Sequence, residues 1–163
     1  MKGNKTQWYI GTPNGVVLSV DERHDTDIKG YYYHAYKREG TALHNLEQMV
    51  FDLEKFFDTI NFPHATTNNR FFTEKASVPT KKQEINKVMT DEELLSKHGD
   101  LGSFIIRVHH RQNSSWQGRV TWMEEDKTVS FRSIFELIKL IDSALDTVEN
   151  PGETDGKKNW EEE

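Results

Sequence analysis

The fold is decided by the stretch VVLSVDERHDTDIKGYYYHAYKREGTALHNLEQMVFDLEKFFD (16–58), because a second stretch of the chain has the same pattern. A shift of 88 residues places it, without gaps, over FIIRVHHRQNSSWQGRVTWMEEDKTVSFRSIFELIKLIDSALD (104–146). Four of the 43 aligned positions are identical, which is close to chance: Val20 with Val108, Arg23 with Arg111, Gly30 with Gly118, and Asp58 with Asp146. The argument for a repeat therefore depends on physical pattern rather than identity.

Both stretches begin with an apolar, β-rich run, at 16–20 and 104–108. Gly30 and Gly118 then precede a second apolar run, YYYHAY or RVTWM, as turns that lead into strands do. Further along, apolar residues recur every three or four positions, which is typical of one face of a helix. They are Leu43, Leu46, Met49, Val50, Leu53 and Phe57 in the first stretch, and Phe131, Ile134, Leu137, Ile138, Ile141 and Leu145 in the second.

The expected helix starts also agree. Asn45 with Gln48, and Ser133 with Glu136, have the spacing of capping boxes. Each stretch thus predicts two strands followed by a helix. Because an isolated hairpin is marginally stable, we predict an α+β fold in which two ββα units share a four-stranded antiparallel sheet, with both helices on one face. The alternative is two unrelated ββα pieces.

The rest of the chain is organised around these two units. Thr90, Glu93 and Gly99 mark a short capped helix between them. After Asp146 the chain is polar and acidic, so we expect a disordered tail. The predicted divisions are an N-terminal segment (1–15), the first unit with its following loop (16–72), a polar linker (73–89), the short helix (90–99), the second unit (100–146) and the tail (147–163).

Composition limits the possible functions. The chain has 163 residues, 34% of them hydrophobic, and no cysteine, which excludes disulfides, thiolate zinc sites and cysteine nucleophiles. Its first residues lack the apolar run of a secretory signal, so we expect a cytoplasmic protein that does not bind membranes. A net charge of −6 argues against general affinity for nucleic acid, although it allows a local basic face.

The window HHRQNSSWQGRVTWM (109–123) contains no acidic residue. Arg111, Gln112 and Asn113 lie in its predicted loop, and Trp116 and Gln117 lie just before the following strand. The aligned loop of the first unit is acidic, and such opposite charges suit head-to-tail association or an acidic partner. Alternatively, the polar loop residues simply suit a turn while the tryptophans fill the core.

Side-chain alternation predicts which residues face away from the helices. Arg107, His109 and Arg119 would share an open sheet face with Tyr31 and Tyr33, able to stack with a base or pair with acidic side chains. The alternative is that the linker helix or a second subunit covers this face. The candidate binding residues are Tyr31, Tyr33, Arg107, His109, Arg111, Gln112, Asn113, Trp116, Gln117 and Arg119.

No motif for catalysis is present. The sequence lacks a glycine-rich phosphate loop, a nucleophile elbow and an HExxH helix, and His109 and His110 would point to opposite faces of a strand. We therefore expect no metal, no cofactor and no enzymatic activity. The leading hypothesis is a cytoplasmic adaptor that binds a protein partner. The alternatives are a regulator that binds nucleic acid or a nucleotide through the sheet face, and an acidic inhibitor from a mobile element that mimics nucleic acid.

Several segments resemble a family of small proteins from anaerobic Gram-positive bacteria. The resemblance is carried by RQNSSWQG, VTW and FRSIFELIKLIDSAL, about the last third of the chain, with YYYHAYKREG and LEKFFDTINFPHATTNNRFF as a second element. No activity is attached to that family, so the resemblance implies no catalytic or binding residue.

Overall fold

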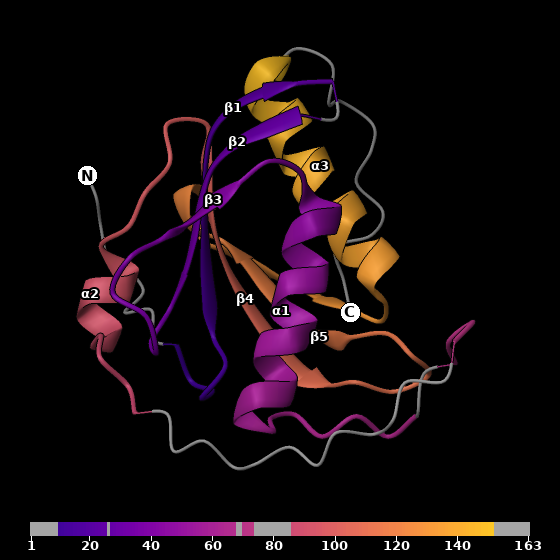
Figure 1. The fold of residues 1–163 in the computed structure, drawn as a ribbon. Coiled ribbons are helices and arrows are strands. Elements are labelled where there is room, and N and C mark those ends of the chain that lie inside the picture. Colours follow the sequence, from indigo (N-terminus) through magenta and orange to yellow (C-terminus); the bar gives the residue numbers. More distant parts are fainter. Residues whose placement is uncertain (1–9, 26, 68–69, 74–85, 152–163) are drawn as a thin grey trace.

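A computed structural model describes residues 10–25, 27–67, 70–73 and 86–151. It contains one antiparallel sheet of six strands in the order β3-β2-β1-β4-β5-β6 (Figure 1). The strands are β1 (Val16–His24), β2 (Asp27–His34), β3 (Thr41–Leu43), β4 (Gly102–His110), β5 (Gln117–Trp122) and β6 (Lys127–Phe131). The helices are α1 (Leu46–Ile60), α2 (Asp91–Leu95), α3 (Ile134–Glu149) and a 3-10 turn, η1 (Met123–Glu125). The predicted α+β class is confirmed.

The prediction of four strands is wrong, because each half of the sheet holds a third strand before its helix. β3 pairs with β2 through Gly30 and Leu43, and β6 pairs with β5 through Gly118 and Phe131. Leu43 and Phe131, which we assigned to the helical pattern, therefore lie on strands. Each half of the sheet therefore contributes three strands before its helix, rather than the two that we predicted.

The helices begin where the sequence predicts. The Asn45 side chain accepts a hydrogen bond from the Gln48 amide at 2.8 Å, and the Ser133 hydroxyl accepts one from the Glu136 amide at 3.1 Å. The Glu136 carboxylate reaches past the cap and accepts from the Arg132 amide instead, at 2.8 Å. At α2, Thr90 and Glu93 form both halves of a capping box.

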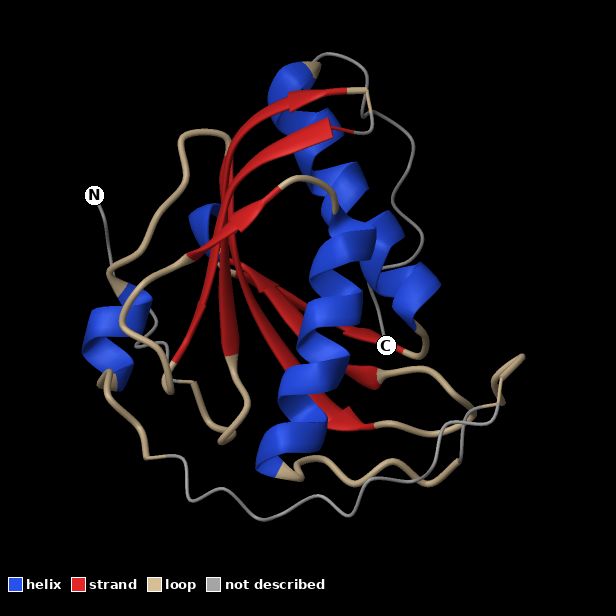
Figure 2. Cartoon of the chain, in the orientation of Figure 1, coloured by secondary structure: helices blue, strands red, loops and turns tan. Residues whose placement is uncertain are grey.

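Helices lie on both sides of the sheet (Figure 2), and buried residues form a core on each face. As predicted, α1 and α3 pack on one face, the inner face, where Leu53 and Leu137 are fully buried with Leu18 and Ile106. The other face, the outer face, is covered at its centre by α2 and the segment near Ile10. The buried residues there are Ile10, Val17, Ala35, Met89, Leu94, Ile105 and Met123. Over the central strands the structure therefore agrees with the alternative in which the linker helix covers this face.

The strand registers of the two halves correspond at the aligned positions. Val17 pairs with Ile105, the residue aligned with it by the 88-residue shift, at the junction of β1 and β4. Both strands carry a bulge at the aligned sites, after Val20 and after Val108. Gly30 and Gly118 lie opposite those bulges, where an added Cβ would meet a carbonyl oxygen of the neighbouring strand at 1.9 Å. Close strand approach therefore explains both glycines.

Candidate binding surface

Arg111 and Trp116, two central residues of the acid-free window, lie inside the molecule. The Arg111 guanidinium is only 4% exposed and donates to Asp58 Oδ1 at 2.8 Å and to the Pro63 carbonyl at 2.7 Å. The Trp116 indole is fully buried and donates to Glu54 Oε1 at 2.6 Å. Both side chains join the second hairpin to α1, so neither is available to a partner.

The polar residues of the same loop mainly shape the turn. The Gln117 side chain accepts from the Gln112 amide at 2.9 Å and donates to the Gln112 carbonyl at 3.1 Å. Asn113 adopts a left-handed conformation and its amide donates to Thr67 Oγ1 at 3.1 Å. These contacts hold the loop against the segment that follows α1, which favours the simple turn interpretation for these three residues.

Arg107 and Arg119 come together on the outer face, directly opposite each other on β4 and β5. Arg107 is half-buried and donates to the Ile10 carbonyl and to Thr121 Oγ1, both at 2.9 Å. Arg119 is exposed, and no carboxylate of the described residues pairs with it. Like charges opposite each other on neighbouring strands repel, so this arrangement makes the potential positive around the exposed Arg119.

Two histidines lie beside these arginines. Burial lowers the pKa of His109, and the nearby His110, Arg107 and Arg119 lower that pKa further. The bulge after Val108 shifts the strand register, so His110 pairs with Gln117 and lies on the same face as Arg107. Sequence reasoning missed His110 because strict alternation places adjacent residues on opposite faces. We call Arg107, His109, His110 and Arg119 the cationic surface.

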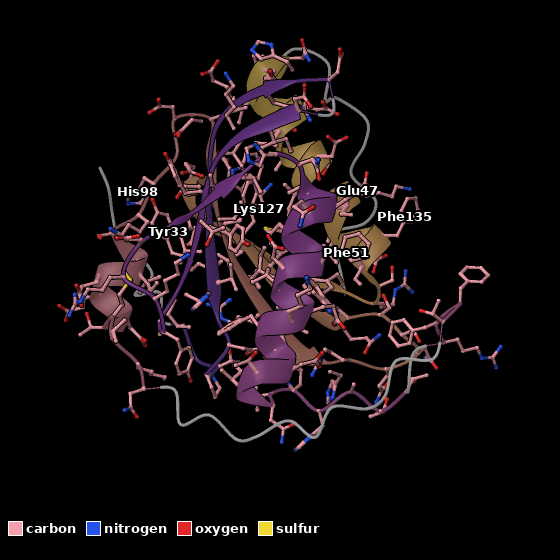
Figure 3. All side chains as sticks on the ribbon, in the orientation of Figure 1. Tyr33, Glu47, Phe51, His98, Lys127 and Phe135 are labelled. Atoms are coloured by element: carbon pink, nitrogen blue, oxygen red, sulfur yellow. The ribbon has the colours of Figure 1, made fainter. Side chains whose placement is uncertain are left out.

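The predicted aromatic residues form a separate group. Tyr31 and Tyr33 lie on β2, three strand positions from Arg119 on β5, or about 14 Å. Tyr33 lies on the same side of the sheet as α2 (Figure 3). Lys97 Nζ lies 5.1 Å from the centre of the Tyr33 ring. α2 and the Ile10 segment cover the strands between the two groups. The tyrosines and arginines therefore do not line one binding site.

A third exposed group lies on the helical side of the sheet. Phe51 on α1 and Phe135 on α3 are 64% and 68% exposed (Figure 3). Lys139 Nζ lies 5.2 Å from the centre of the Phe135 ring. The helical periodicity could have revealed both phenylalanines, since each falls outside the apolar stripe of its helix.

The comparisons with known proteins add no relative: no protein-family model, curated protein or solved structure matches the chain. Among the described residues, no three histidine, aspartate or glutamate side chains are grouped so that they could hold a metal ion. The same part of the chain contains no helix with the length and apolar character to cross a membrane.

Proposed function

We propose that this protein is a non-catalytic adaptor that holds an acidic segment of a partner protein on the cationic surface. The observation that carries the proposal is the direct opposition of Arg107 and Arg119 across β4 and β5. A carboxylate bound at the exposed Arg119 guanidinium, beside Arg107, would form charge-assisted hydrogen bonds with it. Placement in the cytoplasm stays a prediction from the sequence.

The Arg107 side chain is held in place beside Arg119. Thr121 Oγ1 accepts from Arg107 and lies 2.8 Å from Thr128 Oγ1, so a row of hydrogen-bonded side chains crosses β4, β5 and β6. This row fixes the Arg107 guanidinium before binding, which reduces the entropy lost on association. Arg119 is exposed and can adjust to the ligand.

The charge around the cationic surface favours a short acidic segment over a long polyanion. Glu124 and Glu125 follow β5 directly in η1, and the whole chain has a net charge of −6. A nucleic acid strand extending from the arginines would meet this negative potential. A few carboxylates placed between the arginines would avoid it.

A defined probe tests the proposal: an extended peptide, about eight residues long, in which glutamate alternates with valine. Arg119→Glu should weaken its binding about tenfold or more, because one cation is lost and a repulsive charge is added. Lys55→Glu is the matched control, since it makes the same charge change at an exposed residue of α1, away from the cationic surface. Binding that is equally strong in wild type and Arg119→Glu would contradict the proposal.

Two further readouts separate partner classes. In a nuclear magnetic resonance titration, the bound peptide should raise the pKa of His109, because a nearby carboxylate offsets repulsion from Arg107 and Arg119. A single-stranded oligonucleotide of equal charge should bind more weakly than the peptide. Tighter, strongly salt-dependent binding of the oligonucleotide would instead support the nucleic-acid alternative.

A further inference from the structure

We infer that the acidic partner segment binds as an additional β-strand along the free edge of β6. This inference rests on the proposed function and specifies its binding mode. β6 is the last strand of the sheet, and β5 is its only strand partner within the described residues. Half of the backbone N–H and C=O groups of an edge strand point away from the sheet, where an extended chain can pair with them.

The edge of β6 has few of the usual barriers to strand addition. Natural edge strands are often protected by lysine, proline or a bulge. In β6 the lysine is Lys127, at the first position, and Thr128, Val129 and Ser130 follow without charge, proline or register shift (Figure 3). The opposite edge strand, β3, has only three residues and so provides a shorter template.

The side chains of β6 connect this edge to the cationic surface. Ser130 lies directly opposite Arg119, which in turn lies opposite Arg107. A residue of an added strand in the same row would lie about 10 Å from Arg119, measured between backbones. The small Ser130 side chain leaves this path open, so a glutamate on the added strand and the Arg119 guanidinium can meet above it.

Val129, next to Ser130 on β6, determines which residues of the partner segment must be apolar. Val129 is half-buried and pairs with buried Val120, so it belongs to the inner face. The neighbouring residue of an added strand would extend that apolar face. The partner segment is therefore extended and alternates acidic with apolar residues, the acidic ones aligned with Arg119 and the apolar ones with Val129.

The test compares the glutamate-valine peptide with two N-methylated versions, one methylated on the glutamate amides and the other on the valine amides. In an added strand only one of these sets points at β6. We expect one version to bind about tenfold or more weakly and the other to bind nearly as well as the parent. The parent peptide should also slow amide hydrogen exchange in 128–130 of the full-length protein.

The other possible results overturn either strand addition alone or the proposed function as well. Equal binding of all three peptides, with Arg119→Glu still weakening it, would overturn strand addition and leave the proposed function standing. If neither methylated peptide binds and the parent peptide does not slow amide hydrogen exchange in β6, strand addition would again be overturned while the proposed function stands. Failure of the parent peptide to bind would overturn both. A dimer of the protein that the peptide dissociates would show that a second copy occupies β6, which would also overturn the inference.

Discussion

Arg111 bonds to Asp58 at 2.8 Å, and the residues aligned with them by the 88-residue shift, Arg23 and Asp146, form the same ion pair in the other half of the molecule. Each arginine joins the hairpin of one unit to the helix of the other, since Arg23 lies on β1 and Asp146 on α3. Two of the four identities between the repeated stretches are therefore reciprocal contacts between units. The identity of Gly30 with Gly118 has a different explanation, because both glycines lie opposite a bulge where a side chain would not fit.

Arg111→Met should lower the free energy of unfolding by about 2–4 kcal/mol, because the buried Pro63 carbonyl and the Asp58 carboxylate both lose their donor. Asp58→Asn should cost less than about 1 kcal/mol, since that side chain is 59% exposed. Urea unfolding measures both. The control is Arg132→Met, on a side chain that is 86% exposed, and an equal loss there would contradict the interpretation.

Gly118→Ala and Gly30→Ala should each cost about 1–3 kcal/mol, since the new Cβ would force neighbouring strands apart. The matched control is Gly102→Ala, which should cost less because its Cβ would meet side-chain atoms of Leu145 and Phe104 at 3.3 Å rather than backbone atoms. Thermal unfolding measures the three variants. If Gly118→Ala is as stable as wild type, the bulge geometry cannot be the reason for the glycine.

Trp116→Phe should lower the free energy of unfolding by about 2–3 kcal/mol, because it removes buried indole volume and the hydrogen bond to Glu54. The Glu54→Gln change keeps an acceptor while removing the charge. A double-mutant cycle should give a coupling of about 1–2 kcal/mol between the two positions. A coupling near zero would show that Trp116 acts through packing alone.

The His34 imidazole should make stability depend on pH. Burial, followed by repulsion from Lys37, lowers its pKa from 6.5 to about 4, and the ring stacks on Phe56 at 3.8 Å between centroids. The fold thus favours neutral His34, and this contribution is present above pH 6.5 and is lost as pH falls toward 4. After solvent screening we expect a loss of about 2 kcal/mol at most.

The His34→Asn variant tests this dependence, because the amide oxygen can still accept the hydrogen bond from the Tyr36 amide that the imidazole accepts at 3.2 Å. Its stability should fall less than that of wild type between pH 6.5 and 4. Chemical denaturation at several pH values gives both curves. Parallel curves would assign the acid sensitivity to other groups, such as the carboxylates paired with Arg23.

Local patterns predicted the helices better than the strands. The α1 and α3 stripes extend over several turns and begin at side-chain caps, so nearby residues are sufficient to specify them. β3 and β6 are short and lack clear alternation, and they become strands only by pairing with β2 and β5. The two missed strands therefore depend on long-range contacts. The same holds for the bulge that brings His110 onto the outer face.

The sequence by itself determined the order of the two units, the position and caps of their helices, and the presence of one acid-free window in an acidic chain. Only the tertiary structure decided what the arginines of that window do. Arg111 is buried because α1 of the other unit brings Asp58 against it. Arg119 is exposed because it lies on the outer face beyond the cover of α2. Both outcomes depend on packing between segments far apart in the chain, which no local pattern encodes.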